Sequence, residues 1–513
     1  MSVESFLSSP WTCSHPAYEN SSFNLRPAPE FATAEVVLAS TYRAAGFLGV
    51  TEGQIPAQGR ELDKRSRKVR KSVAGPRQIE QDTWRTILHG ALQSPKQPQQ
   101  SAKRFLQLSP VIPDTALYSG SARLSGNSWN PGQLVSAMVA IGCPSDEAAQ
   151  SLWSELHDAL SVGEDDDIWA RWLQLEFERQ RFVTVDWQPR SISALCRWPA
   201  QEREGLHFPA RQFVLDLRAV LRAKRQMTRR QWSSLLESVL RIGAVAHVMW
   251  LCEVSDRLWR ELRAVLGGSH APSAAALTRT LVAPASRSLV YGSPAIPIVR
   301  DRASGYLNAR LGINLVLHEL ELQGISTGSL DSLADVSAFL ASVQSRSAKL
   351  AERDVLGALA KLQDEQARTL ACKRGIGSNI AEFCRHSLGQ RQTADDSLRG
   401  YDQGFHLKKR GGYAAAPWVV SLGPVALLTL VHCCLAEAAG PRSVQRLSEH
   451  LECYGLKVYP DNFATGEIGR SLRMLGLVLD SPDAESGMLL VPPFEISRDV
   501  GARRRDVENG GIE

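Results

Sequence analysis

The residues of this chain that are best suited to a chemical role are lysines and arginines grouped in short runs. The densest run spans residues 64–71, where six of eight residues are basic and none is acidic: Lys64, Arg65, Arg67, Lys68, Arg70 and Lys71. Such a run attracts polyanions, because each phosphate that it neutralises releases condensed counterions. Two interpretations stay open here, a basic arm that contacts nucleic acid and a solvated loop without a specific ligand.

A second basic group lies ahead of the C-terminal region. It consists of three adjacent residues near three aromatic ones: Lys408, Lys409 and Arg410, with Tyr401, Phe405 and Tyr413. Aromatic rings beside cations can stack on bases while the cations hold phosphates. A basic segment rich in glycine is also typical of a linker, and we expect residues 401–422 to form one.

A third basic group falls at a joint between two predicted helices. Its members are Arg222, Lys224, Arg225, Arg229 and Arg230. If the three groups converged on one face of the folded protein, they would form a common track for a polyanion. Dispersal of the groups would instead favour a protein that binds other proteins.

Catalytic signatures are missing from the sequence. It has no GxxxxGK(S/T) phosphate-binding loop, no GxSxG nucleophile motif and no HExxH metal motif. His318-Glu319 begins like the last of these, but Leu322 stands where the second histidine would be. Cys-x-x-Cys pairs, which are usual in structural zinc sites, do not occur either. We therefore expect no catalytic residue, no metal and no cofactor.

Two groups of titratable residues allow a structural as well as a functional interpretation. Residues 164–167 are all acidic, and acidic side chains are favoured at the start of a helix by its dipole. A helix cap is therefore favoured over a metal site. His247, Glu253 and Asp256 are the candidates if the chain is an enzyme with an unrecognised site. Because His247 and Glu253 lie in an apolar helical segment, we expect them to be a satisfied buried pair.

The composition is that of a folded protein. Of the 513 residues, 43% are hydrophobic and 22% are charged, and the net charge is +5, which is far from the disordered regime. We find no run of about 18 apolar residues that would span a membrane, and the N-terminus lacks the basic start of a secretory signal. Nine cysteines, an odd number spread thinly, suit a reducing compartment. We expect a cytoplasmic protein.

Helical periodicity dominates the chain, and strand-like patterns are few and late. The predicted fold class is mainly α, with a multi-helical body and a C-terminal winged-helix domain that carries a short β-hairpin. Ser145 and Thr228 are placed to cap helices, and residues 228–266 are expected to hold more than one helix. The expected divisions of the chain are a basic N-terminal region (1–110), an α-helical body of one or two subdomains (111–400), the linker (401–422), the winged helix (423–494) and a flexible tail (495–513).

The C-terminal region has the clearest local pattern. Pro424 suits the first turn of an apolar helix, and Ser443 could cap a second one. A loop over residues 459–462 precedes a third helix, at residues 465–475. Two apolar runs between residues 477 and 491 predict strands around an acidic turn. This order, three helices followed by a β-hairpin, resembles the winged helix-turn-helix fold.

The resemblance implies a role for the third helix, but the charge of the region opposes it. In winged helices that bind nucleic acid this helix enters the major groove, so Arg470 and Arg473 would contact the ligand. Residues 442–494 hold five basic and seven acidic residues, and three of the acids lie in the wing at residues 480–485. A domain held to DNA mainly by electrostatics should not be net acidic. The region would therefore borrow charge from residues 408–410, or bind protein.

These patterns support three hypotheses about function. The favoured one is a non-enzymatic, nucleic-acid-associated subunit of a bacterial multi-protein assembly, of the kind that serves phage defence or mobile elements. Its partners would be nucleic acid and other protein subunits, and it would not contact a membrane. The second is a protein–protein adaptor or scaffold whose winged helix docks a partner protein. The third is an enzyme with an unrecognised site.

Overall fold

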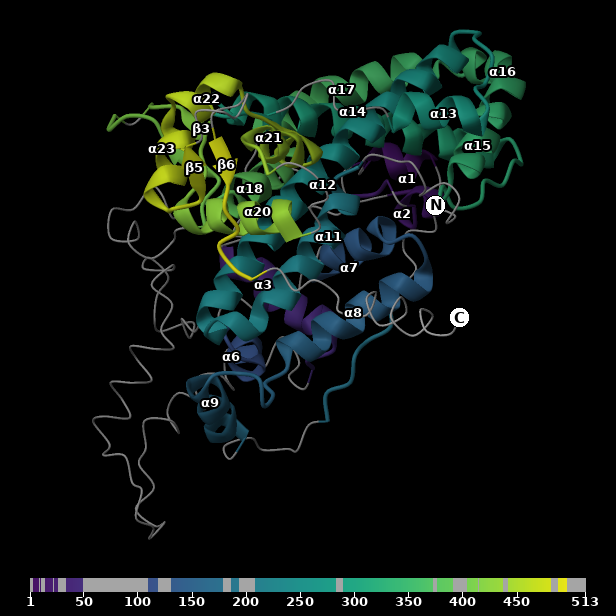
Figure 1. The fold of residues 1–513 in the computed structure, drawn as a ribbon. Helices are drawn as coiled ribbons and strands as arrows, with labels where there is room; N and C mark the ends of the chain where they lie inside the picture. The colour runs from purple at the N-terminus through teal and green to yellow at the C-terminus, as the bar shows by residue number, and fades with distance from the viewer. Residues whose placement is uncertain are drawn as a thin grey trace, which may run out of the picture.

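The protein is mainly α, with short strand pairs concentrated near the C-terminus, as the sequence predicts (Figure 1). This computed structural model describes residues 3–8, 10, 14–21, 23–25, 34–48, 109–118, 131–178, 186–192, 208–282, 289–371, 376–390, 404–413, 415–436, 442–480 and 488–495. The basic run at residues 64–71 lies outside the described residues, and so does the expected tail beyond residue 495. The expected division into domains stays a prediction.

The helical body is built from three groups of helices. The first group comprises α1 (Val3–Ser8), α2 (Pro16–Glu19), α3 (Ala34–Ala45), α6 (Pro113–Tyr118), α7 (Pro131–Gly142), α8 (Asp146–Leu160) and α9 (Ile168–Glu178). The central group comprises α11 (Pro209–Arg222), the short 3-10 helix η3 (Ala223–Gln226), α12 (Arg229–Leu266), α13 (Ala274–Leu281) and α14 (Ile296–Leu322). The last group comprises α15 (Leu333–Ser345), α16 (Ser347–Glu352), α17 (Val355–Ala371) and α18 (Ile376–Ser387).

The remaining elements belong mostly to the C-terminal region. They are β1 (Leu289–Val290), β2 (Leu407–Lys409), β3 (Trp418–Val420), α20 (Pro424–Ala436), α21 (Val444–Cys453), β4 (Leu456–Lys457), α22 (Pro460–Ala464), α23 (Glu467–Met474), β5 (Val478–Asp480) and β6 (Met488–Leu490). Strands β2 and β3 pair antiparallel, as do β5 and β6, whereas β1 and β4 pair parallel. Single bridges at Tyr291 and Pro294 join the β1 segment to β3.

One long helix, α12, forms the centre of the body. Thr228 caps it through a capping box with Gln231, as expected for a threonine at this position. The prediction of more than one helix over residues 228–266 is wrong, because α12 runs for 38 residues without a break. Within it, Gly243 lets α11 approach closely, because an added Cβ would lie only 2.5 Å from the ring of Phe213.

The apolar character of α12 comes from its central position. Among the described residues it is the one helix that is long and apolar enough to cross a membrane, and 94% of its apolar stretch is buried inside the protein. Helices α3, α7, α11, α14, α18 and α20 all pack against it. Close contact with α14 depends on Gly312, where an added Cβ would lie 2.2 Å from the ring of Trp259. Such burial is typical of a core helix.

A buried arginine fixes the N-terminal end of α12. The guanidinium of Arg229 pairs with Asp166 at 3.0 Å, and both side chains are 1% exposed. Arg229 also donates to the carbonyl oxygens of Val111, Ala159, Leu160 and Ser161 and to the hydroxyl of Tyr42. Together with Asp166, these acceptors lie on α3, before α6, at the end of α8 and in the loop that follows it. The guanidinium, with five donors in a rigid fork, therefore joins segments that are far apart in the sequence.

The acidic tract at residues 164–167 supplies the counter-charges of this joint. Burial raises the pKa of Asp166, but Arg229, the Gly163 N–H and Lys224 together outweigh it and hold the pKa below its ordinary value. Asp167 caps α9 by accepting from the N–H groups of residues 169 and 170. The preference for a helix cap over a metal site at this tract agrees with that role of Asp167.

Replacement of Asp166 tests the buried joint. We expect Asp166→Asn to lower the free energy of unfolding by about 3–5 kcal/mol, because it leaves the buried Arg229 without its counter-charge. Denaturant titration at neutral pH measures the loss. The control is Asp165→Asn, whose carboxylate pairs with Arg225 on the surface and should cost no more than about 1 kcal/mol. Equal losses in both variants would refute a special role for Asp166.

The same carboxyl group makes stability depend on pH in a defined direction. Its folded pKa lies below the ordinary value of 3.8, so the unfolded chain binds more protons near that pH. The contribution of Asp166 is therefore complete above this value and is lost as the pH falls through the folded pKa. We expect the stability difference between the wild type and Asp166→Asn to shrink between pH 5 and pH 2, which are about the limits of such a transition. A constant difference would contradict the assignment.

Candidate functional site

The C-terminal elements lie together at one end of the helical body (Figure 1). Their order is compatible with a winged-helix-like arrangement: α20, α21, α22 and α23 are followed by the β5–β6 hairpin. A bridge between Ser443 and Leu489 adds the segment before α21 to that hairpin. The expected loop over residues 459–462 is largely replaced by the short helix α22, because Pro460 is preorganised for a first helical turn. Ser443 occupies the N-cap position of α21 but makes no capping hydrogen bond through its side chain.

Helix α23 has the amphipathic pattern that the sequence predicts for a third helix. Ile468 and Leu472 are fully buried, whereas Arg470, Arg473 and Met474 are exposed. Met474 is 84% exposed, which is unusual for a large apolar side chain. Both arginines expected to contact a ligand therefore face solvent.

The two arginines of α23 differ in what surrounds them. Arg473 lies against Asp480 of β5, with its Nε 3.2 Å from both carboxylate oxygens and its Nη2 3.1 Å from one of them. Arg470 makes no ion pair within the part of the chain that the structure describes. One acid of the wing thus already neutralises Arg473. The other two acids of the wing tip lie outside the described residues.

The basic group at residues 408–410 lies on a hairpin beside α23. Lys408 and Lys409 belong to β2, which pairs with β3, and Arg410 donates its backbone N–H to the Pro417 oxygen at 2.9 Å. Nζ of Lys408 lies 3.2 Å from Oε1 of Glu467, the first residue of α23. Within the expected linker, residues 407–420 thus contain a hairpin that pairs with the β1 segment. This contact places the basic group next to α23.

The third basic group has two members with a structural role, Lys224 and Arg229, whereas Arg222, Arg225 and Arg230 are exposed. Arg229 is buried in the joint described above, Lys224 pairs with Asp166 at 3.0 Å, and Arg225 pairs with Asp165 at 2.8 Å. Burial, followed by the charge of Arg229, lowers the pKa of Lys224. Arg229 and Lys224 are therefore engaged within the body and contribute little to a track for polyanions, whereas Arg225 and its partner Asp165 are exposed. Residues 64–71, the first basic group, lie outside the described residues.

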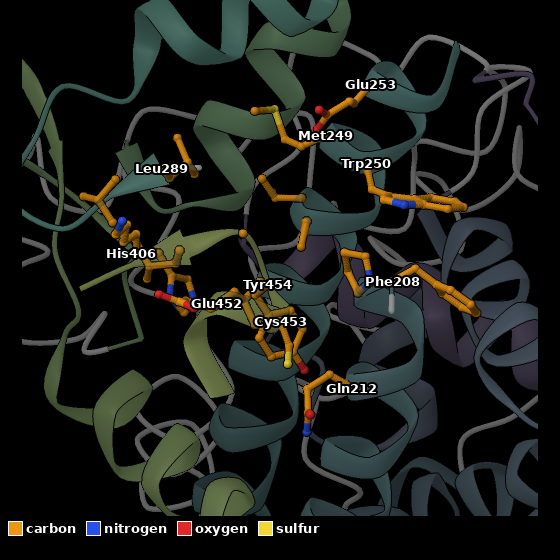
Figure 2. Close-up of a pocket in the computed structure, with 18 of the residues that line it drawn as sticks. Phe208, Gln212, Met249, Trp250, Glu253, Leu289, His406, Glu452, Cys453 and Tyr454 are labelled. Atoms are coloured by element: carbon orange, nitrogen blue, oxygen red, sulfur yellow. The ribbon is translucent and has the colours of Figure 1, made fainter. Parts of the chain in front are cut away.

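A pocket of about 840 Å³ is lined by residues of both the helical body and the C-terminal elements (Figure 2). Figure 2 shows Met249, Trp250 and Glu253 of α12 on one side, with Cys453 and Tyr454 at the end of α21 on another. Its size and largely apolar lining are typical of sites for small molecules. This pocket is not predictable from the sequence, because its walls come from segments with no common local pattern.

One carboxylate that lines this pocket is neutralised by its neighbours. Glu253 pairs with Arg257 at 2.7 Å and with Arg302 at 2.9 Å. The expected pair of His247 and Glu253 is not formed, because a separation of six residues turns the two side chains to different sides of α12. His247 instead stacks on Trp250, and burial lowers its pKa to about 3.

Asp256 and the Cys453 thiol are two further groups that could take part in catalysis. Asp256, the remaining candidate for an enzyme, pairs with Arg260 one turn along α12. Burial, followed by Asp216, raises the pKa of the Cys453 thiol, so it is a poor nucleophile at neutral pH. Among the described residues discussed here, no nucleophile is paired with a general base.

A buried carboxylate attaches the C-terminal elements to the body. Asp216 of α11 is fully buried, and its Oδ2 accepts from the Tyr454 hydroxyl at 2.7 Å and lies 3.0 Å from Nε2 of His450. Gln212 donates to the other oxygen at 2.8 Å. Burial, followed by Asp216, raises the pKa of Tyr454 well above its ordinary value, so the hydroxyl keeps its proton.

With this geometry in hand, the chain was compared with known proteins. No protein-family model, curated protein or solved structure matches it.

Removal of one hydroxyl tests how α21 is held. We expect Tyr454→Phe to lower the free energy of unfolding by about 1–3 kcal/mol, because the buried carboxylate of Asp216 loses one of its hydrogen-bond donors. Chemical denaturation followed by circular dichroism measures the change. Tyr459→Phe is the matched control, since Tyr459 is 48% exposed and should change stability by less than about 0.5 kcal/mol. If the two variants were equally stable, Tyr454 would not be a significant anchor.

Proposed function

We propose that this protein is a non-catalytic, nucleic-acid-associated subunit of a multi-protein assembly. Its contact surface would combine the β2–β3 hairpin with the exposed face of α23. The observation that supports this most directly is the contact between Lys408 and Glu467, which brings the basic hairpin to the helix. The charge that the C-terminal elements lack is then supplied by a neighbouring part of the chain. The bacterial origin, the cytoplasmic location and a role in phage defence or mobile elements stay predictions.

The ion pairs at this surface are compatible with binding a polyanion. Lys408 and Glu467 are each about half exposed, as are Arg473 and Asp480. Exposed pairs of this kind contribute only about 0–1 kcal/mol, so a phosphate can replace the carboxylate at small cost. Arg410 and Arg470 are exposed and make no ion pair among the described residues, so they need no such exchange there. Tyr413, 62% exposed, adds an aromatic ring next to the hairpin on which a base could stack.

Salt-dependent binding tests this proposal. We expect the protein to bind a short duplex or a single strand at about 50 mM salt, with an affinity that falls steeply as salt is raised. Joint replacement of Lys409, Arg410 and Arg470 by Gln should weaken binding at least about tenfold and reduce the salt slope by about 2–3, because three phosphate contacts are lost. Fluorescence anisotropy with labelled oligonucleotides measures both quantities.

The control for this experiment is Lys361→Gln. Lys361 is an exposed lysine of α17, and its replacement changes the net charge without touching the proposed surface. We expect the control to retain wild-type affinity apart from a small general effect of charge. Absence of binding to every duplex and single strand at low salt would overturn the proposal.

A protein–protein adaptor is the second candidate, and two exposed apolar residues favour it. Met474 of α23 and Leu479 of β5 are 84% and 63% exposed, and methionine beside arginine is typical of the central part of protein interfaces. For an adaptor, Met474→Ser with Leu479→Ser would abolish capture of a protein partner from the native cells. The replacement of Lys409, Arg410 and Arg470 would then have a smaller effect on that capture, which separates the two candidates.

A further inference from the structure

The N-terminal segment of the chain is attached to α14 by a row of polar side chains. Tyr306, Arg310, Asn314 and His318 are spaced four residues apart, so they lie on one face of α14. Each of them is at least nine-tenths buried. Helices α1 and α2 pack against α14 at this face (Figure 1). Polar groups buried in this way are expected to have hydrogen-bond partners.

Three members of the row find their partners in the N-terminal segment. The Tyr306 hydroxyl accepts from the Leu25 N–H at 2.8 Å, and Arg310 donates to the Ser14 hydroxyl at 2.7 Å. The side-chain oxygen of Asn314 accepts from the N–H of His15 at 2.7 Å. Three side chains of the row therefore hold the N-terminal segment at residues 14, 15 and 25.

The fourth member, His318, differs from the other three. It is 1% exposed, and within the part of the chain that the structure describes neither of its ring nitrogens has a hydrogen-bond partner. Two metal-binding groups lie beside it. The ring of His15 is 4.9 Å away in an edge-to-face arrangement, and the nearer carboxylate oxygen of Glu321 lies 4.0 Å from Nδ1 of His318.

We propose that His15, His318 and Glu321 bind a divalent transition-metal ion that fastens the N-terminal segment to α14. One ligand atom from each of the three residues lies within 4.8 Å of the others. Nε2 of His15 is 3.2 Å from Oε2 of Glu321, close to the separation of about 3.3 Å between donors that tetrahedral zinc requires. Glu321 is half exposed, so its side chain can move the short distance that brings it closer to His318.

The donor set indicates the class of metal. Two imidazoles and one carboxylate suit zinc and its neighbours in the first transition row, whereas magnesium and calcium prefer oxygen ligands alone. Glu321 faces solvent, which provides an entry path and leaves a fourth position for water. The metal would link residues far apart in the chain and satisfy His318, the one member of the row without a partner among the described residues.

Metal binding has one structural consequence at His15. Its Nδ1 accepts from the N–H of Ala17 at 3.2 Å, which places the ring proton on Nε2 while no metal is bound. Coordination through Nε2 moves that proton to Nδ1, so the long Ala17 hydrogen bond is exchanged for a metal–nitrogen bond. The amide resonance of Ala17 would therefore change when the metal binds, while the amides of the remote α17 would not.

Zinc binding by the full-length, tag-free protein tests the proposal. After treatment with EDTA, the wild type is dialysed against Zn²⁺ and its metal content is compared with those of His318→Ala and Glu321→Gln. We expect one zinc per chain to be lost in His318→Ala, and the affinity of that site to fall at least about tenfold in Glu321→Gln. Mg²⁺ should not compete. His270→Ala, which removes an exposed histidine elsewhere, is the control for loose surface binding.

Thermal unfolding gives a second readout that does not depend on counting metal. Zinc should raise the melting temperature of the wild type and of His270→Ala, because it binds only the folded site, and should raise that of Glu321→Gln by less at the same zinc concentration. Glu321→Gln decides the matter if His318→Ala does not fold, since residue 321 is half exposed. Equal zinc content and equal stabilisation in the wild type and Glu321→Gln would overturn the proposal and leave His318 with water as its partner.

Discussion

The arrangement of the helical body depends on the burial of one guanidinium. Arg229 stands at the first position of α12 and reaches acceptors on α3, on the segment before α6, at the end of α8 and in the acidic loop that follows. A buried charge is tolerated only when it is paired and its donors are satisfied. The four segments must therefore meet at this one point. Once the start of α12 is fixed, its apolar length sets where α11, α14, α18 and α20 can pack.

The C-terminal elements are also held by a buried charged group, in this case a carboxylate with fewer partners. Asp216 on α11 is buried with Tyr454 and His450 at the end of α21, so the body and the C-terminal elements share a polar contact at the edge of the apolar pocket. The β1 segment, which continues into α14, also pairs with β3 and β4. The surface proposed to bind nucleic acid is therefore oriented by the body rather than by its own hairpin.

Local chemistry was enough to predict much of the fold. The cap of α12 at Thr228, the cap of α8 at Ser145 and the antiparallel pairing of β5 with β6 all depend on residues close together in the sequence. Features that depend on distant residues were not predictable in this way. The close packing of α11 on α12 rests on Gly243 beside Phe213, and the hairpin of β2 and β3 also pairs with the β1 segment. The pocket and the contacts of Asp216 likewise join residues from opposite ends of the chain.

The basic groups show why a count of charges cannot by itself assign a function. Arg229 and Lys224 looked as available as Lys408 in the sequence, yet their ion pairs with Asp166 are buried, while the pair of Lys408 with Glu467 is exposed. A buried pair cannot exchange its carboxylate for a phosphate without exposing an uncompensated charge. An exposed pair can, because water and salt already weaken it. Burial of the partner, which only the fold determines, therefore separates the cations that hold the protein together from those that can bind a ligand.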